Sequence, residues 1–195
     1  MSPKRARSGR TNGGATESDA HGAAPAHGAG PDVAALERFL RSIGIDPRLD
    51  PEYTKTAELA AEFLAERTAG LREEIRPLRT ARYRGHPGEA IALEEIPVYG
   101  LCPHHLAPYF GEAQVRYVPR SKVAGPSSIA RLIRDLARIP RIQENLTQAI
   151  ADHLERALEP ATVEVIVRSR HLCAEMRGVE QRVQFVTEAR RAERG

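Results

Sequence analysis

Two short segments, far apart in the chain, contain the side chains most able to bind a transition metal. Residues 102–105 read Cys-Pro-His-His, and residues 171–173 read His-Leu-Cys. Thiolate sulfur and imidazole nitrogen are ligands that zinc prefers. Cys102, His105 and Cys173 therefore form a candidate Cys₂His site that leaves a fourth position open for water. That arrangement is typical of catalytic zinc sites, because structural sites are normally closed by four protein ligands.

Two other interpretations of these residues remain open from the sequence. Cys102 and Cys173 could be buried thiols, with the neighbouring histidines satisfying hydrogen bonds. Alternatively, both cysteines and both histidines could close a structural zinc site of the ribbon type, although two complete predicted helices separate the two segments. A disulfide is not expected, because the chain has only two cysteines and no sign of an oxidising compartment. The open metal site is the leading interpretation.

Each metal-binding segment comes just after a predicted β-strand. The first strand is expected at about 90–99, and the second at 162–169, where Val163, Val165 and Val167 alternate with polar or exposed positions. A loop at the end of a strand exposes its side chains on a rigid support. The pattern thus places the candidate ligands where chemistry is commonly found.

The remaining patterns complete an α+β domain. Further strands are expected at 112–118 and 182–187, and two helices lie between the strand at 112–118 and the strand at 162–169. Ser127 can cap the first helix, and the second runs from about 143 to 158. The apolar positions that the helices should bury are Ile129, Leu132, Ile133, Leu136, Leu146, Ile150 and Leu154. The order ββααββ predicts an antiparallel sheet with helices on one face.

Two helices are expected before this core. Asp32 can cap the first, which Gly44 ends. The second covers about 56–69 and should turn Leu59, Phe63 and Leu64 inward. Residues 31–89 are therefore assigned to an N-terminal helical segment and residues 90–195 to the core of the same domain.

Composition limits the function classes. The chain has 195 residues and 41% hydrophobic residues, which suits one globular domain, and it lacks an apolar run long enough for a membrane span. Residues 1–30 have no apolar run of the secretory type and are expected to be a disordered tail, so the chain is expected in the cytoplasm. This tail carries about +2 of the net charge of +3. The rest is nearly neutral, which argues against a nucleic-acid-binding surface.

Three motifs, in order and at matching spacing, resemble those of the GTP cyclohydrolase I family. The first is LCPHHLAPYFG at 101–111, the second is GPSSIAR at 125–131 followed by IQENLT at 142–147, and the third is HLCAEMRGV at 171–179. The resemblance covers roughly residues 91–187. It implies the tunnelling fold and a symmetric homo-oligomer, possibly a decamer, with active sites between subunits. Such an assembly would also cover the two open edges of a four-stranded sheet.

The resemblance also implies a reaction. In the family, a zinc ion (ferrous iron is an alternative) is held at the positions of Cys102, His105 and Cys173, and activated water opens the guanine imidazole ring at C8. Formate leaves, and the product is 7,8-dihydroneopterin triphosphate. The matching site residues are His104, His171 and Ser127 for catalysis, Gln143 and Glu144 for the guanine, and Arg131 and Arg177 for the phosphates. Without the motifs, Gln143 and Glu144 would simply suit a helix N-terminus.

The sequence departs from the family where the triphosphate should bind. Ser128 stands in place of a lysine, and Glu58 and Ala61 align with an arginine and a lysine of the second helix. Pro103 replaces an acidic residue. Three functions follow as hypotheses: a GTP cyclohydrolase I, a paralogue acting on a less phosphorylated guanine nucleotide, nucleoside or base, or a non-catalytic regulator that binds a purine or pterin.

Overall fold

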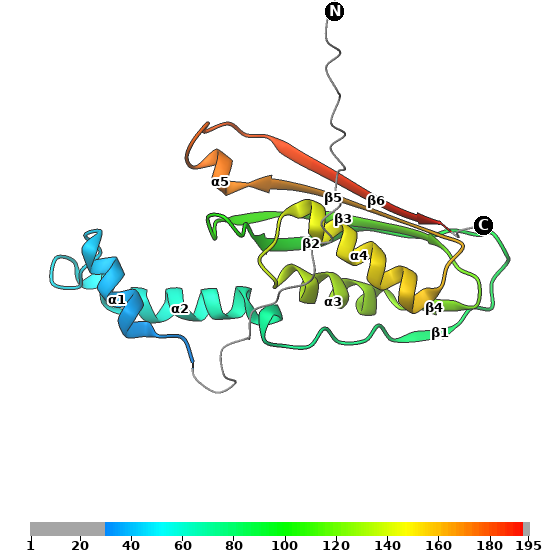
Figure 1. The fold of residues 1–195 in the computed structure, drawn as a ribbon, viewed down its shortest axis with the longest axis horizontal. Coiled ribbons are helices and arrows are strands. Elements are labelled where there is room, and N and C mark those ends of the chain that lie inside the picture. Colours follow the sequence, from blue (N-terminus) through cyan, green and yellow to red (C-terminus); the bar gives the residue numbers. More distant parts are fainter. Residues whose placement is uncertain (1–29, 193–195) are drawn as a thin grey trace, which may run out of the picture.

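The computed structural model describes residues 30–192 (Figure 1). The tail expected at 1–30 lies outside this range, apart from Gly30. The N-terminal part contains α1 (Val33–Ser42), η1 (Pro51–Lys55), α2 (Thr56–Arg67), η2 (Ala69–Leu71) and β1 (Thr80–Arg82). The rest contains β2 (Ile91–Leu101), β3 (Pro108–Val118), β4 (Lys122–Ala124), α3 (Pro126–Ala137), α4 (Gln143–Leu158), β5 (Thr162–His171), α5 (Leu172–Glu175) and β6 (Gln184–Ala192). None of the described helices is both long and apolar enough to span a membrane.

The main sheet is antiparallel, with the strand order β2-β3-β5-β6, and α3 and α4 cover one of its faces (Figure 1). The predicted ββααββ order and the α+β class are therefore confirmed. Alternation buries one face of each strand: Ala113, Val115 and Tyr117 of β3 are all 0% exposed. They pack against the apolar faces of the two helices, where Ile129, Ile133, Leu146, Ile150 and Leu154 are equally buried.

The centre of the sheet requires a glycine where β3 meets β5. Gly111 pairs with Ser169, and a Cβ atom on Gly111 would lie 1.9 Å from the carbonyl oxygen of Arg168. No other residue fits there without moving the backbone of β5. This close approach lies between β3, which follows the first metal-binding segment, and β5, which leads to the second.

Some boundaries differ from the sequence prediction. The last strand runs from Gln184 to Ala192, well beyond the expected end at residue 187. The sequence did not indicate this extension, because the buried Ala189 lies among exposed charged residues that hide the alternation. Ser127 does not cap α3: the N-cap is Gly125, and Pro126 occupies the first turn. The small sheet formed by β1 and β4 was not predicted, because three-residue strands leave no recognisable pattern.

We call α1, η1 and α2 the N-terminal arm; it extends past the end of the sheet that carries α5 (Figure 1). As predicted, the Asp32 side chain caps α1 by accepting from the Ala35 N–H at 2.9 Å, and Gly44, with φ +90°, follows the helix. The expected inward packing of α2 is wrong for Leu59 and Phe63 within this chain, whereas Leu64 is half-buried. Leu59 is 57% and Phe63 45% exposed, because α2 packs on α1 and contacts little of the core.

Strand β2 forms one edge of the sheet and contains a bulge. The pairing with β3 shifts register between Leu93 and Ile96, and Glu95 adopts a positive φ of 55°. Beyond the bulge, regular pairing resumes and runs to the end of the strand at Leu101. The bulge therefore separates the outer half of the edge from the half that leads to Cys102.

Candidate active site

A tight loop after β2 carries the first candidate ligands. The Cys102 N–H donates to the Ala107 carbonyl at 3.0 Å, and the Leu106 N–H donates to the Cys102 carbonyl at 2.9 Å. Leu106 closes the loop in the left-handed region, with φ +50°. Cys102 is buried, whereas His104 and His105 are exposed. The loop thus holds one thiol at its base and two imidazoles on its surface.

Strand register brings the second segment to this loop. Leu101 pairs with Pro108 across β2 and β3, and Tyr109 pairs with His171 across β3 and β5. The end of β5 therefore lies beside the loop, and the short helix α5 follows directly with Cys173 in its first turn. Three adjacent strands position segments that are far apart in the sequence.

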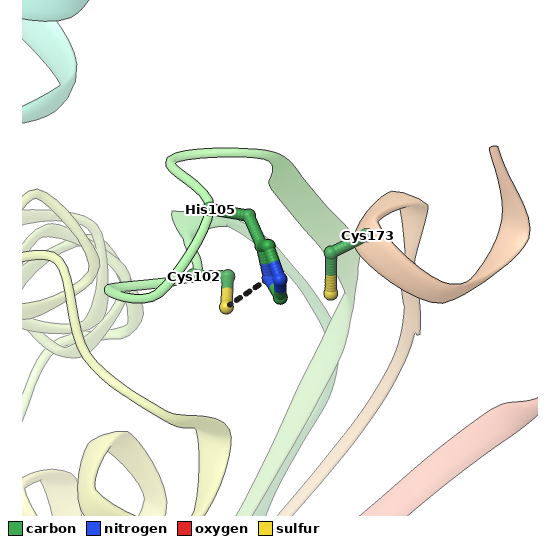
Figure 2. A group of neighbouring side chains, drawn as sticks. All are labelled: Cys102, His105 and Cys173. Atoms are coloured by element: carbon green, nitrogen blue, oxygen red, sulfur yellow. Dashed lines mark hydrogen bonds between the residues drawn. The ribbon is translucent and has the colours of Figure 1, made fainter. Parts of the chain in front are cut away.

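The three predicted metal ligands lie together (Figure 2). The ligand atoms of Cys102, His105 and Cys173 are all within 4.8 Å of one another, and the Cys102 sulfur is 3.8 Å from Nδ1 of His105. Ligand atoms around a tetrahedral zinc ion lie about 3.5–3.8 Å apart, given Zn–S and Zn–N bonds of about 2.3 and 2.0–2.1 Å. Two thiols and one imidazole at this separation fit a zinc-class ion. Burial, and to a smaller extent the adjacent Cys102, raises the pKa of the Cys173 thiol.

His171 is not part of this ligand group, because a different network holds it. Its Nε2 lies 2.9 Å from Oε1 of Gln143, its ring stacks on Tyr109 at 4.9 Å, and Phe185 meets it edge-on. Burial lowers the pKa of His171, and the nearby Glu144 carboxylate opposes that shift. Nδ1 of His104 is 3.7 Å from the Cys102 sulfur, but among the described residues only Cys102, His105 and Cys173 form a group whose ligand atoms all lie within 4.8 Å of one another. The ribbon interpretation, which needs four ligands, is therefore not supported by this geometry.

The orientation of the Gln143 amide fixes the hydrogen on His171. Nε2 of Gln143 lies 2.9 Å from the Val167 carbonyl and 3.2 Å from the Phe185 carbonyl, and carbonyls only accept hydrogen bonds. Oε1 must then face the other way, where it accepts from the Ser169 hydroxyl and from His171. His171 therefore carries its hydrogen on Nε2, which leaves Nδ1 available. The Gln143 side chain is 0% exposed, and both ends of its amide are already hydrogen-bonded within the chain.

A cavity of about 440 Å³ opens over the ligand group. All three ligands contribute to its wall, as do both catalytic candidates, His104 and His171. The α3–α4 connection and the start of α4 also contribute to the wall, through Arg141 and Glu144. The arrangement places a metal-binding group, two imidazoles and a carboxylate around one space.

The charged groups of this cavity differ in their pairing. Glu175 is held by Arg170, whose Nε donates at 2.9 Å, and this contact lowers the pKa of Glu175. Arg141, in contrast, is half-buried, and its Nε is shielded from solvent without a hydrogen-bond partner. Burial accordingly lowers the pKa of Arg141. Glu144 is exposed to the cavity, and no salt bridge joins it to any residue among 30–192.

Comparison with known proteins agrees with this geometry. Residues 33–193 match the GTP cyclohydrolase I family. The GTP cyclohydrolase 1 of Geobacillus kaustophilus is 39% identical over 75% of this chain and 78% of the relative. Those of Lactiplantibacillus plantarum and Aquifex aeolicus are also 39% identical, over 75% and 74% of this chain and 78% and 77% of the relatives. The chain belongs to the GTP cyclohydrolase I family.

This family match confirms the resemblance drawn from the three motifs. Members of the GTP cyclohydrolase I family are enzymes. Among solved structures, the archaeosine synthase QueF-Like in the apo form matches with a TM-score of 0.39 and 20% identity, over 54% of this chain and 96% of that one. This likeness is too weak to bear on function. The family assignment therefore rests on the sequence comparisons and agrees with the α+β architecture.

Two residues that the GTP cyclohydrolase I resemblance assigns to the site lie elsewhere in this chain. Ser127 and Arg131 are on α3, which starts next to β4 at the end of the sheet opposite α5 (Figure 1), and neither lines the cavity. Arg177 is near the ligand group of Cys102, His105 and Cys173: its Nη1 is 2.8 Å from Nε2 of His105. Ser128 is buried, and its hydroxyl accepts the Arg79 N–H at 3.0 Å.

Sequence reasoning missed several residues that shape the site. Tyr109 lies in a recognised motif, but only the strand register reveals that its ring supports His171. Ser169 and Thr187 hold Gln143 from two different strands. One feature of Arg141 was visible in the sequence: it is a cation two residues before Gln143, where the helix that carries the substrate-binding candidates begins. That feature could not indicate whether the cation was already paired.

Proposed function

We propose that this chain hydrolyses the imidazole ring of GTP at C8, releases formate, and converts the opened nucleotide to 7,8-dihydroneopterin triphosphate. One observation supports this most strongly. Cys102, His105 and Cys173 form a three-ligand group on the wall of the same cavity that His104 and His171 line. In a member of the GTP cyclohydrolase I family, this is the arrangement that water attack on an aromatic carbon requires.

Cys102, His105 and Cys173 would hold the metal, zinc or ferrous iron. When bound, such an ion lowers the pKa of a water molecule to about 7 and thereby supplies hydroxide at neutral pH. The cavity beside these residues is large enough to admit a purine nucleoside next to the ligand group. Closure of the cavity around the base would exclude bulk water from the reacting carbon.

His104 and His171 would carry the protons. Imidazole suits this role because its pKa lies near the operating pH. The hydrogen on Nε2 of His171 is committed to Gln143, so Nδ1 is the nitrogen that can accept or return a proton. His104 is exposed at the cavity mouth, where it can exchange protons with solvent.

Glu144 would hold the guanine base. Its carboxylate faces the cavity without a cation bound to it, and a carboxylate can accept from both N1–H and the 2-amino group of guanine. Gln143 matches a guanine-binding position of the family, but its amide is occupied inside the domain. We therefore assign base recognition to Glu144 and give Gln143 the task of orienting His171.

The active enzyme would be a homo-oligomer whose sites are completed by neighbouring copies. Ser127 and Arg131 do not line the cavity of their own chain, so they would serve the cavity of another. The exposed apolar residues of the arm and the open edges of the sheet supply surfaces for such contacts. In that assembly, Ser127 would assist the histidines, and Arg131 and Arg177 would bind phosphate.

A second candidate function is the same ring opening on a guanine compound with fewer phosphates. Ser128 occupies the position of a phosphate-binding lysine and is engaged with the Arg79 backbone. Arg141 is the only Lys or Arg among the residues that line the described cavity. Charge-assisted contacts to phosphate contribute about 1.5–3 kcal/mol each, so their loss would weaken triphosphate binding substantially.

A turnover assay with GTP, GMP, guanosine and guanine, each monitored for formate and for pterin fluorescence, tests both proposals. Preference for GTP supports the first, and similar kcat/KM values along the series support the second. Glu144→Ala should abolish turnover of every substrate, whereas Asn145→Ala, the exposed neighbour on the same helix, should not. Absence of formate from all four substrates with the metal-loaded protein would overturn both and leave a non-catalytic purine-binding or pterin-binding role.

A further inference from the structure

Arg141 is a half-buried cation whose side chain has neither a hydrogen-bond acceptor nor an ion-pair partner among the described residues. Its guanidinium is half-buried on the cavity wall, and Nε makes no hydrogen bond. Among residues 30–192, no ion pair and no side-chain hydrogen bond includes Arg141. Burying part of a cation without an acceptor is unfavourable, so such a group normally finds its acceptor in a ligand or a partner.

The backbone fixes Arg141 beside the reacting centre. The Arg141 N–H donates to the Leu101 carbonyl at 3.2 Å, and Leu101 immediately precedes Cys102. Arg141 also lies close to the buried hydroxyl of Tyr109, another polar atom without a partner. The side chain therefore starts from a rigid point at the edge of the metal-binding loop.

Arg141 and Glu144 present complementary groups to the same space. They are three residues apart at the start of α4, both line the cavity, and both act electrostatically on the Tyr109 hydroxyl. No salt bridge within the described chain joins them. One wall of the cavity thus offers a free acceptor and, next to it, a free donor.

A 2-amino-6-oxopurine has the matching edge. Its 2-amino and N1 groups are donors, and the adjacent 6-oxo oxygen is an acceptor. A carboxylate can take both donors, and a guanidinium is a common partner for the 6-oxo oxygen of guanine. A 6-aminopurine would instead direct a donor at the guanidinium and leave both unsatisfied.

We propose that Arg141 is a specificity-determining residue that donates to the 6-oxo oxygen of the purine held by Glu144. This inference rests on the proposed function, because it concerns the same cavity and base. It assigns the discrimination between 6-oxo and 6-amino purines to a residue outside the catalytic and metal-binding sets.

The test compares two triphosphates, GTP and 2,6-diaminopurine riboside triphosphate, with the metal-loaded protein. We expect Arg141→Met to lower kcat/KM for GTP by about ten- to a hundredfold while changing the value for the 6-amino analogue little, so that the ratio of the two falls. Arg141→Lys should restore part of the preference. Arg156→Met, an exposed arginine at the other end of α4, serves as the matched control and should leave the ratio unchanged.

Binding measurements separate this inference from the proposed reaction. Guanosine and 2-aminopurine riboside, which is fluorescent and lacks the 6-oxo group, can be compared by equilibrium titration even if nothing is turned over. Selective weakening of guanosine binding in Arg141→Met supports the inference. Equal weakening of both ligands would overturn it, as would a loss seen with GTP and absent with guanosine, which would mean that Arg141 binds phosphate.

Discussion

The helix–sheet core and the N-terminal arm use similar apolar side chains in opposite ways. In the core, Leu154 of α4 and Ile133 of α3 are 0% exposed. In the arm, Phe39 of α1 is 58% and Phe63 of α2 is 45% exposed, although α1 has apolar residues at regular helical spacing. The core completes its packing within one chain, whereas the arm does not.

This difference indicates where each region obtains its stability. Burial of apolar surface contributes roughly 25 cal/mol per Å², so the core gains most of this energy before any association. The exposed stripe of the arm gains it only when another surface covers it. We therefore expect changes in the core to affect metal binding, chemistry and chain stability, and changes in the arm to affect assembly.

The largest effect is expected from replacing one of the three metal-ligand candidates in the core. Cys173→Ala should reduce bound metal from about one ion per chain to none and abolish turnover, because two remaining ligands cannot hold the ion tightly. Metal analysis measures the bound ion, and size-exclusion chromatography measures the association state. The proposed oligomer should persist, since Cys173 lies outside the arm. Full metal occupancy in this variant would show that the ligand assignment is wrong.

Gln143→Met should be next in magnitude. It preserves most of the volume but removes the acceptor for Nε2 of His171, so kcat should fall by about ten- to a hundredfold with a smaller change in KM. Nitrogen-15 NMR of His171 should show the loss of a single tautomer. Gln148→Met, further along the same helix and exposed, is the control. An unchanged tautomer together with a large loss of activity would contradict the orienting role of Gln143.

Leu154→Ala examines the interior of the core itself. Removal of a fully buried leucine side chain should lower the free energy of unfolding by about 2–5 kcal/mol. Urea denaturation of the metal-free protein measures the free energy of unfolding without a contribution from metal binding. A loss below 1 kcal/mol would mean that the core packs less tightly than its burial indicates.

Phe63→Ser should have the smallest effect on the chain and the clearest effect on assembly. Because nearly half of the Phe63 surface is exposed, we expect the unfolding free energy at low protein concentration to change by less than about 1 kcal/mol. The proposed oligomer should shift toward smaller species in sedimentation velocity. If the association state stayed the same while the chain unfolded more easily, the contrast between arm and core would be refuted.

Local patterns predicted most of the fold, and short motifs predicted the metal group. The alternation of Ala113, Val115 and Tyr117 marks β3, because a half-buried strand must alternate. The pairing of β1 with β4 could not be predicted, since it depends on contacts between segments distant in sequence. The same limit applies to Gln143. Its environment depends on the register that brings Thr187 of β6 and Ser169 of β5 to its amide, and no single segment contains that information.

The bulge in β2 interrupts an exposed edge of the main sheet. A long, regular edge strand can recruit strands from other chains without limit, which is one origin of fibrous aggregates. In β2 the register shift and the positive φ of Glu95 interrupt the edge, and the exposed Glu94 and Glu95 place two negative charges there. The bulge divides the regular pairing of β2 into two short stretches, residues 91–93 and 96–101. The exposed edge is therefore short and flanked by negative charge, which disfavours continuous strand addition, and Glu95→Val should increase the tendency to aggregate.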